Sequence, residues 1–432
     1  MLHANKAVLK NCKIYQMLLK SSKKKHLSFH TPGHKIGKWD ITELAYSDNL
    51  SAPSGCIAEA EKDIAEIVGA NKSFILTDGS TSGVLSMLYA AKQLGVKRIA
   101  VFEKSHKSIF NGCKLLGLTP LVYTVKNSEE IPKHPTMYGL SEEFPHLLEE
   151  ADAIFVTSPD YYGNVADLSA MRAYCDEKKK LLLVDGAHGG HLHFDKNVHA
   201  GAYADMWVDG VHKSLPALTQ GAVVSARTKD CAEALHEGVN IFRTTSPSYP
   251  IMASVEYAVK YPQNKGLEEA VKKYAHTSER IYLAEDWTKL CALFGENAFA
   301  AESALQAKGI YPEFCDGNVV MLYLSPATTE KDFRCLKREL EKLFVLYPYA
   351  PVAKTEQKAD KIVSCETYTK KWVELEEAEG KICAADCGLF PPCTPLLRAG
   401  DRIGSYEISL LQKASNVYGL VDKKILIVEE EE

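Results

Sequence analysis

Short apolar runs alternate with helical patterns through the middle of the chain. Six of these runs predict β-strands, at residues 73–77, 98–103, 153–157, 181–185, 206–209 and 222–226. Between the first two, an apolar helix is expected to begin near Thr81 and to end before Gly95, because the DGSTSG segment supplies hydroxyl caps and glycines together. Strands that alternate with helices are typical of a doubly wound α/β domain, so we expect a mostly parallel central sheet flanked by helices.

The pattern changes beyond about Pro250. Longer, charge-rich helices are expected there, such as one over residues 267–293, followed by a strand over residues 318–324. Apolar residues then recur at helical spacing, at Phe333, Leu336, Leu340, Leu343 and Phe344. These patterns predict a smaller α+β domain in the C-terminal third. The first 26 residues are basic and mildly amphipathic, which predicts an N-terminal helix.

Composition narrows the class of protein. The 432 residues carry 51 basic and 56 acidic side chains, a formal net charge of −5, and 46% of the residues are hydrophobic. This balance is typical of a globular protein and argues against a nucleic-acid binder that relies on a basic field. No run approaches the roughly 18–20 apolar residues of a membrane span, and the N-terminus lacks the features of a secretory signal. The 12 cysteines include no CxxC pair, so we expect a cytoplasmic protein without disulfides or a metal site.

Two polar features come at the carboxyl ends of predicted strands, where open α/β sheets bind ligands. The first is the DGSTSG segment, which fits a phosphate cup at a helix N-terminus about as well as a plain helix cap. The second is Asp185, either a capping residue or the partner of a cationic ring nitrogen or a metal. The spacing of His188, His191 and His193 matches neither HExxH nor a zinc finger, so we expect no metal there.

A third feature is the pair His212 and Lys213, which follows the run at 206–209 inside an apolar stretch. A desolvated lysine has a lowered pKa, and its neutral amine forms a Schiff base with an aldehyde; a surface lysine in a loop is the alternative. Taken in order, the three features are an anion cup, an aspartate at a strand end and a lysine 28 positions later. They meet the three demands of pyridoxal phosphate, namely a phosphate anchor, a counter-ion for the pyridinium nitrogen and an amine for the aldehyde.

The sequence resembles the pyridoxal-phosphate-dependent ornithine/lysine/arginine decarboxylases, which have the aspartate aminotransferase fold (fold type I). The resemblance covers nearly the whole chain. In chain order the motifs are HTPGHKIGK (30–38), DITEL (40–44), GSTSG (79–83), SHKS (105–108), TSPDYYG (157–163), VDGAHG (184–189), HKSLPALTQ (212–220), TTSPSYPIMAS (244–254) and FPPCTPLLRAGDRI (390–403). So many matches in the same order are far more specific than one glycine loop.

The resemblance implies that the activity is decarboxylation of a basic L-amino acid (arginine, lysine or ornithine) to the corresponding amine. Lys213 would be the Schiff-base lysine, and Asp185 would pair with the pyridine nitrogen. His106 would stack over the ring, and His188 would lie close to the ring substituents. These four are the expected catalytic residues, and they also bind the cofactor.

The phosphate end of the cofactor has its own expected residues. By the same resemblance, Ser80 and Thr81 would hold the phosphate, with His212 beside it. The segment 244–249 would lie near a dimer interface, since relatives of this fold type build their active sites between two subunits. We therefore expect a homodimer or a larger homo-oligomer whose partner is otherwise a small-molecule amino acid. The motif order implies an arm over residues 1–45, a cofactor domain over 46–255 and a small domain over 256–432.

The chain departs from the family pattern at several positions. Gly210 stands where the family usually has a serine that binds phosphate, and Ser51 stands where it has a histidine. Cys393 and Asp401 replace the usual glycine and glutamate of the C-terminal signature. Two alternatives therefore stay open. One is a pyridoxal-phosphate aminotransferase or lyase acting on a related amino acid. The other is a non-catalytic relative that regulates an active decarboxylase.

Overall fold

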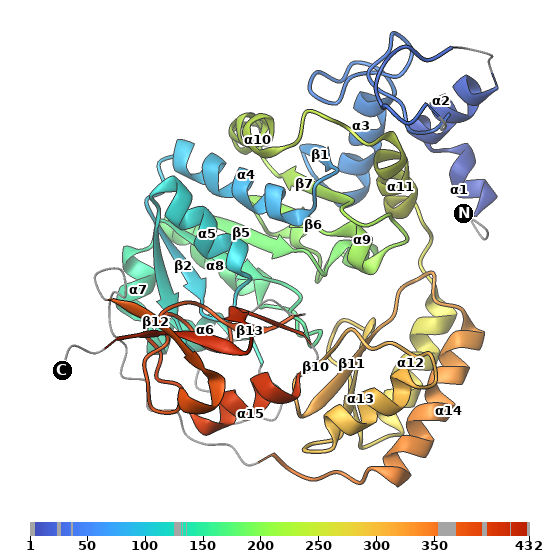
Figure 1. Ribbon diagram of the computed structural model, residues 1–432. Helices are drawn as coiled ribbons and strands as arrows, with labels where there is room; N and C mark the ends of the chain where they lie inside the picture. Colours follow the sequence, from blue (N-terminus) through green and yellow to red (C-terminus); the bar gives the residue numbers. More distant parts are fainter. Residues whose placement is uncertain are drawn as a thin grey trace. The chain divides into compact units, whose positions relative to one another are not determined.

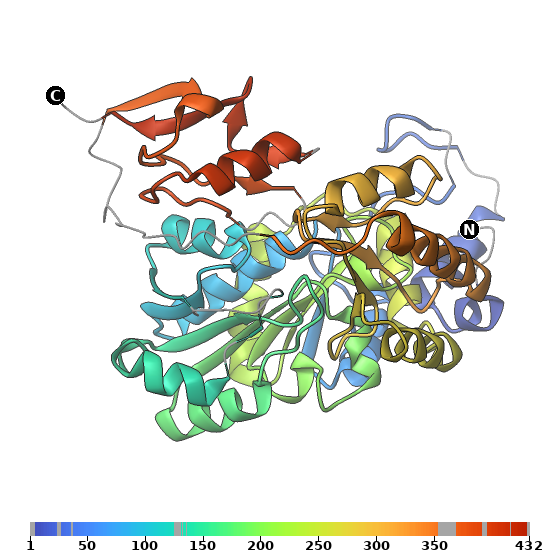
Figure 2. The ribbon, with the colours of Figure 1, turned by 90° about the horizontal axis from the view of Figure 1, so that it is seen from below.

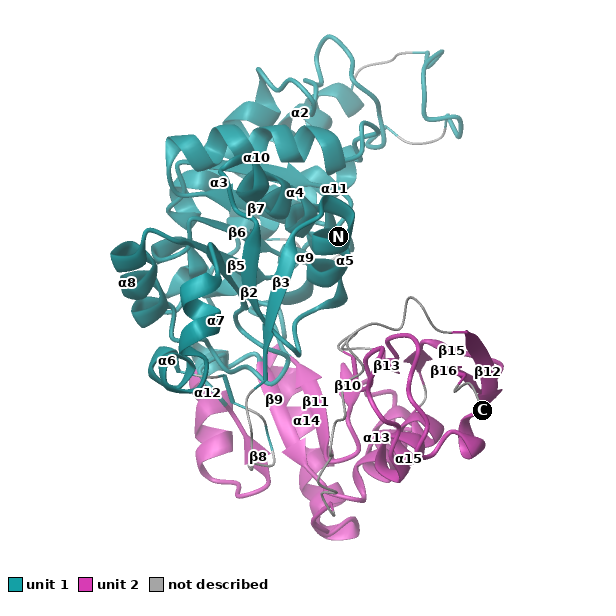
Figure 3. Cartoon of the chain, turned by 90° about the vertical axis from the view of Figure 1, so that its left-hand side faces the viewer, with its two compact units in different colours: residues 1–268, 284–288, 324–328 teal, residues 269–283, 289–323, 329–432 magenta. Residues whose placement is uncertain are grey.

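The computed structural model describes residues 5–23, 27–35, 38–124, 131, 133–134, 136–352, 369–390, 395–414 and 416–429. The chain divides into two compact units (Figure 3). Unit 1 comprises Met1–Glu268, Ala284–Thr288 and Leu324–Thr328, and unit 2 comprises Glu269–Leu283, Lys289–Tyr323 and Thr329–Glu432. Two short segments from the C-terminal half of the sequence thus belong to unit 1.

A seven-stranded sheet of order β1-β7-β6-β5-β4-β2-β3 forms the centre of unit 1 (Figure 1). Its strands are β1 (Lys72–Leu76), β2 (Arg98–Phe102), β3 (Thr119–Tyr123), β4 (Ala153–Thr157), β5 (Leu181–Gly186), β6 (Met206–Asp209) and β7 (Ala222–Ala226). Strands β3, β2, β4, β5 and β6 pair in parallel, whereas β7 is antiparallel to β6 and β1. The mostly parallel sheet flanked by helices is confirmed, and β3 is a strand that the apolar pattern did not reveal.

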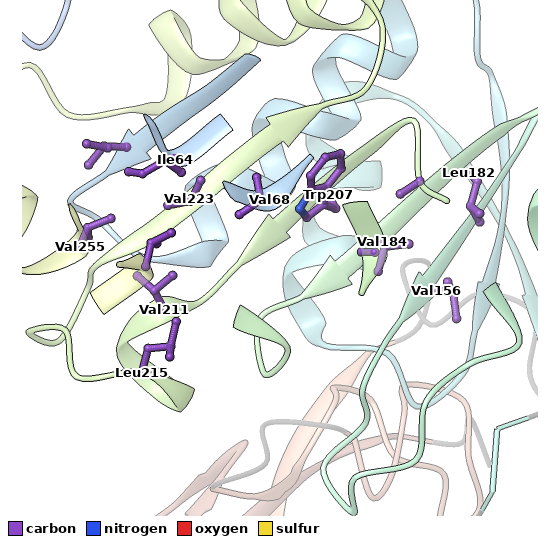
Figure 4. Close-up of a cluster of buried hydrophobic side chains, with 14 of the residues drawn as sticks. Ile64, Val68, Val156, Leu182, Val184, Trp207, Val211, Leu215, Val223 and Val255 are labelled. Atoms are coloured by element: carbon purple, nitrogen blue, oxygen red, sulfur yellow. The ribbon is translucent and has the colours of Figure 1, made fainter. Parts of the chain in front are cut away.

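Helices cover both faces of this sheet (Figure 2). One face packs against α2 (Lys13–Ser22), α3 (Cys56–Val68), α8 (Leu168–Lys178) and α11 (Tyr249–Val259), and the other against α4 (Ser80–Gln93), α5 (Lys107–Leu116) and α10 (Lys229–Phe242). Within β5, Leu182 and Val184 join the first cluster, which Figure 4 shows around Trp207, whereas Leu183 joins the second. Burial on both faces explains why the strands read as continuous apolar runs rather than alternating ones.

The N-terminal region of unit 1 forms two helices, so the single expected N-terminal helix is wrong. Helix α1 (Lys6–Lys10) ends at Asn11, and α2 begins at Lys13. Cys12 offers no side-chain cap; instead the buried Glu256 of α11 accepts hydrogen bonds from Lys13 N (2.6 Å) and Ile14 N (2.9 Å). A long-range carboxylate that satisfies the free N–H groups of α2 makes a new helix start there.

The remaining elements of unit 1 are short. They are α6 (Met137–Glu143), α7 (Pro145–Glu150), α9 (Val211–Ser214) and two 3₁₀ turns, η1 (Gly190–Phe194) and η2 (Ala200–Ala202). Helix α12 (Lys265–His276) begins in unit 1 and continues in unit 2. In the described part of the chain, no helix is long and apolar enough to cross a membrane.

Unit 2 contains a four-stranded sheet of order β10-β11-β9-β8. Its strands are β8 (Ile281–Tyr282), β9 (Lys289–Leu293), β10 (Phe314–Cys315) and β11 (Val319–Tyr323), and its helices include α13 (Ala298–Gln306) and α14 (Glu330–Leu346). The expected helix over residues 267–293 is wrong, because α12 ends at His276 and residues 289–293 pair with β11. The strand expected over residues 318–324 and the helix that buries Phe333 and Leu340 are both present.

The last part of unit 2 has small antiparallel sheets. Strands β12 (Lys370–Glu374), β15 (Leu420–Val421) and β16 (Lys424–Val428) form one of them, and β13 (Gly388–Leu389) pairs with β14 (Val417–Tyr418). A 3₁₀ turn, η3 (Leu375–Glu377), and helix α15 (Ser405–Lys413) complete the unit. Its core contains Leu397, Ile403 and Ile425, among other residues.

Candidate active site

Lys213, the lysine predicted from the sequence to bind the cofactor, lies on a short turn whose flanking residues are buried in the core. Lys213 is in α9, directly after β6, and its neighbours Val211 and Leu215 are buried in the cluster of Figure 4. The backbone of the turn is fixed further, because His212 N donates to Gly221 O (3.0 Å). Apolar anchors on either side therefore place a half-buried amine at the carboxyl end of a central strand.

His188 and Lys213 are in direct contact. Lys213 Nζ lies 3.1 Å from His188 Nε2, and the ring of Tyr161 packs edge-on against the His188 ring at a centroid distance of 4.5 Å. His188 comes three residues after Asp185, the last acidic residue of β5. The Asp185 side chain is buried and accepts a hydrogen bond from Ala187 N (3.1 Å). Because β5 and β6 are adjacent parallel strands, Asp185 and the Lys213–His188 contact lie toward the same, carboxyl end of the sheet.

His106 belongs to the same site. It is the N-cap of α5, and its Nδ1 accepts a hydrogen bond from Ser108 N (3.2 Å). Burial lowers the pKa of His106, the charge of Asp185 raises it and the charge of Lys213 lowers it again. The charges of Asp185 and Lys213 therefore both act on His106. The net lowering of the His106 pKa keeps its imidazole neutral near pH 7.

The DGSTSG segment forms a turn at the start of a long helix. Gly79 adopts a positive φ of 86°, and the 14-residue α4 begins at Ser80 without a side-chain N-cap. The Ser80 hydroxyl oxygen is buried and has no hydrogen-bond partner among the described residues, whereas the Thr81 side chain is exposed. The free N–H groups of the first helical turn and the buried hydroxyl favour an anion at this position.

Asp78 ties this turn to a distant segment. Its carboxylate accepts hydrogen bonds from the Ser82 hydroxyl (2.8 Å) and from Thr244 N (2.9 Å). The segment 244–249, expected near a subunit interface, therefore begins beside the anion-binding turn. His212 lies on the same lysine turn as Lys213, and its Nδ1 donates to Gly221 O (2.8 Å). Burial lowers the pKa of His212, which leaves this ring neutral near pH 7.

Gly210 has a steric explanation. A Cβ atom at this position would lie 2.4 Å from Ala187 O and 2.8 Å from Ser80 Oγ. Both distances are shorter than ordinary contacts, so this backbone accepts glycine without rearrangement and a serine only if its surroundings shift. The Ser80 hydroxyl occupies the space that a side chain at residue 210 would need.

The other departures are Ser51, Asp401 and Cys393. Ser51 is exposed, and its N–H donates to Asn49 Oδ1. In unit 2, Asp401 accepts a hydrogen bond from Arg398 N (2.8 Å), which makes it part of a local turn. Cys393 lies outside the described residues.

Sequence reasoning missed three residues that contact the site or its supports. Tyr161 lies in the TSPDYYG motif, for which the sequence predicts no contact, and the histidine spacing predicts only that His191 does not bind a metal. Asp286, which pairs with His191 at 2.8 Å, lies far beyond the cofactor domain as the sequence delimits it. No local pattern could have revealed Asp286, because the chain returns to unit 1 there for only five residues.

The residues present fit pyridoxal phosphate. A buried, unpartnered Ser80 hydroxyl at a helix N-terminus suits its phosphate, and the buried Asp185 carboxylate suits a protonated ring nitrogen. Lys213 supplies an amine, and His106 supplies a neutral ring close to both. The fold is that of the pyridoxal-phosphate enzymes of fold type I, and the chain shares it with solved structures of a lysine decarboxylase and of SPT with PLP.

Within that class, the chain belongs to the Orn/Lys/Arg decarboxylase family, since the model of its major domain matches residues 38–289. The chain is 28% identical over 480 residues to the uncharacterized protein YaaO of Bacillus subtilis (strain 168), covering 98% of this chain and 99% of that protein. It is 26% identical to an arginine decarboxylase of the same organism, covering 93% of each chain. The solved structure of the constitutive lysine decarboxylase of Escherichia coli has a TM-score of 0.71 at 17% identity, covering 98% of this chain and 82% of that one.

Proposed function

We propose that this protein is a pyridoxal-phosphate-dependent carboxy-lyase that converts a basic L-amino acid, namely arginine, lysine or ornithine, into the corresponding amine. The observation that carries the proposal is the contact of 3.1 Å between Lys213 Nζ and His188 Nε2 next to the buried Asp185. Membership of the decarboxylase family and the likeness to an arginine decarboxylase support it. The amines formed are polyamines or their precursors, and we place the reaction in the cytoplasm.

Each candidate residue has a task that its surroundings favour. Ser80 would bind the cofactor phosphate together with the N–H groups of α4, with Thr81 and His212 nearby. Lys213 would hold the aldehyde carbon. Asp185 would keep a proton on the ring nitrogen, since a buried carboxylate favours a positive partner. Pyridoxal phosphate supplies an electron sink for the pair of electrons left when carbon dioxide departs.

Proton transfer falls to the Lys213–His188 pair. After carbon dioxide leaves, the substrate carbon needs one proton, and Lys213 Nζ and His188 Nε2 can share it across 3.1 Å. His106, neutral because burial lowers its pKa, would cover the ring without adding a positive charge to the site. Tyr161 would limit the movement of His188 by packing against its ring.

We also propose that the active form is a homodimer or a larger homo-oligomer. Two observations support this. The Thr244–Asp78 hydrogen bond joins segment 244–249 to the turn at Asp78–Ser80. In the N-terminal region, the apolar side chains of Leu27 and Phe29 are 80% and 93% exposed. Light scattering after size exclusion would show a mass of at least two chains, and a monomer with full activity would contradict the proposal.

The function is tested with purified full-length protein, pyridoxal phosphate and each of the three amino acids. Release of carbon dioxide in equal amount to the amine is expected from at least one substrate. Lys213→Ala should abolish it, whereas Lys229→Ala, at an exposed lysine of α10, should not change it. A keto acid in place of the amine would indicate an aminotransferase. A chain that stays colourless with the cofactor and inactive on all three substrates would favour the regulatory relative.

A further inference from the structure

A buried histidine–aspartate pair lies next to the lysine turn. His191 Nε2 is 2.8 Å from Asp286 Oδ1, and the two side chains are 1% and 0% exposed. Thr288 donates to the same carboxylate oxygen twice, from its N–H (3.0 Å) and from its hydroxyl (2.6 Å). The Trp287 ring stands perpendicular to the His191 ring at 6.4 Å. The segment Ala284–Thr288 thus holds one imidazole by polar and apolar contacts together.

The hydrogen bonds of His191 determine how its ring is oriented. A carboxylate oxygen only accepts, so His191 Nε2 carries the proton of the 2.8 Å bond. His191 Nδ1 is buried and has no partner in the described part of the chain. The bond to Asp286 is therefore the one that fixes the orientation of this ring among the described residues.

Two connections lead from this pair to the His188–Lys213 contact. His191 N donates to the hydroxyl oxygen of Ser214 (3.3 Å), the residue after Lys213. Asp286 N donates to Gly163 O (3.0 Å) in the loop whose Tyr161 packs against the His188 ring. One residue, Asp286, is thus bonded to the η1 turn that follows His188 and to the loop that restrains His188.

We propose that His191 and Asp286 are positioning residues, which hold Lys213 and His188 in the geometry that the cofactor-bound site requires. The proposal rests on the proposed function and extends it to residues outside the site itself. Neither residue touches the reacting atoms. They act through the lysine turn and η1, which carry or adjoin the reacting groups. A small displacement of a reacting group lowers the reaction rate strongly.

The test compares two probes on the full-length chain. Pyridoxal phosphate forms a carbon–nitrogen bond with Lys213 Nζ, with loss of water, and the rate of its visible absorption change reports the placement of the amine. Pyridoxine phosphate has no aldehyde, so its affinity, measured by calorimetry, reports the phosphate and ring contacts without the bond to Lys213. Asp286→Ala should slow the absorption change by about 10- to 100-fold. Its affinity for pyridoxine phosphate should stay within about twofold of wild type, because Ser80 and α4 are unaffected.

Conservative and control variants separate positioning from general damage. Asp286→Asn keeps an oxygen that accepts from His191 Nε2, so it should restore the rate to within about threefold of wild type. Asp205→Asn removes another buried carboxylate of unit 1, which bonds Arg172 and Arg227, and should leave both probes unchanged. If Asp286→Ala does not fold, His191→Phe replaces it, since this variant keeps an aromatic ring and loses the Nε2 proton. Equal losses for both probes, or an unchanged rate, would overturn the proposal.

The same variants can be examined without the cofactor. Acetic anhydride acetylates free amines, and peptide mapping measures the label on Lys213 in the full-length chain. Because His188 Nε2 lies 3.1 Å from Lys213 Nζ and restrains it, loosening His188 should make Nζ more accessible and raise labelling about threefold or more in Asp286→Ala. If wild-type protein shows no absorption change, the proposed function is contradicted. The ratio of Lys213 labelling in Asp286→Ala to that in wild type would still test the positioning role. Equal labelling in the two proteins would contradict that role.

Discussion

Two buried aspartates of the central sheet have contrasting partners. Asp205, just before β6, bonds Arg172 and Arg227 at 2.8 Å each and also accepts from Leu182 N. Asp185, at the end of β5, accepts a hydrogen bond from Ala187 N, and no cationic side chain is recorded in contact with it among the described residues. The first carboxylate is neutralised by its own chain. The second keeps bonding capacity, which its proposed role toward a protonated ring nitrogen requires.

The largest expected effect concerns Asp205. Asp205→Asn removes the charge between two guanidinium groups, one of which is mostly buried, and should lower the free energy of unfolding by about 3–5 kcal/mol. Activity per folded molecule should not change. Denaturant unfolding measures the first quantity and a steady-state assay the second. A loss under about 1 kcal/mol would show that this pair does not stabilise the sheet.

Asp185→Asn should have the opposite effect: it should lower the activity and leave the stability of the fold unchanged or higher. The variant keeps the shape of the side chain but cannot hold a proton on a ring nitrogen, so kcat/KM should fall by about 10²–10³-fold, or about 3–4 kcal/mol. Stability should stay equal to wild type or rise, since the carboxylate is buried without a cationic side chain in direct contact among the described residues. Activity within about tenfold of wild type would remove Asp185 from the proposed site.

Glu61 is a buried carboxylate whose cationic partners lie farther away than those of Asp205. It is buried, with Arg243 at 3.7 Å and Lys72 at 3.8 Å, and burial raises its pKa from 4.5 to about 7 against the opposing effect of these cations. Between pH 4.5 and 7 the folded chain holds a proton that the unfolded chain has lost. This group therefore stabilises the fold below pH 4.5, and its contribution is lost as the pH rises to about 7.

Glu61→Gln should remove that pH dependence, which is worth on the order of 2 kcal/mol. The measurement is the free energy of unfolding at pH 5 and at pH 7.5 for wild type and variant. The variant should gain stability relative to wild type at the higher pH. An identical pH slope in the two proteins would mean that Glu61 titrates normally.

The smallest expected effect concerns carboxylates that bind backbone N–H groups. Glu256→Gln weakens the cap of α2 and also removes the charge that pairs with Lys260 at 2.8 Å, so together these losses should cost about 1–2 kcal/mol. Its control is Glu59→Gln, whose carboxylate forms an exposed ion pair with Lys13 at 3.5 Å and should cost less than about 0.5 kcal/mol. Thermal unfolding of both variants gives the comparison, and equal losses would contradict the capping role.

The sequence predicted the central sheet well because its strands are buried on both faces. The bounds of β4, β6 and β7 agree with the apolar runs, and each of these strands is almost fully buried. Strand β3 lies at the edge of the sheet and is only partly buried, so its pattern was too weak. The sequence predicts a helix over Lys289–Leu293 because this segment adjoins a charged helical stretch. Its pairing with β11 is a long-range effect.

The site was predictable only as far as local signals reach. Asp185, His188 and Lys213 follow strand ends that the apolar pattern defines, and the contact between His188 and Lys213 agrees with that placement. The His191–Asp286 bond joins residues 95 positions apart, and the steric need for glycine at 210 depends on Ala187 O and Ser80 Oγ. Such relations follow from packing in three dimensions and leave no trace in the local sequence.

The identity of the amine that holds the cofactor tests the central claim most directly. The full-length protein is incubated with pyridoxal phosphate, reduced with borohydride and mapped by peptide mass spectrometry. Because Lys213 lies between buried anchors, beside His188 and within electrostatic reach of Asp185, the phosphopyridoxyl group should be found on Lys213 at close to one per chain. Label spread over exposed lysines, with none on Lys213, would contradict the assignment of this site.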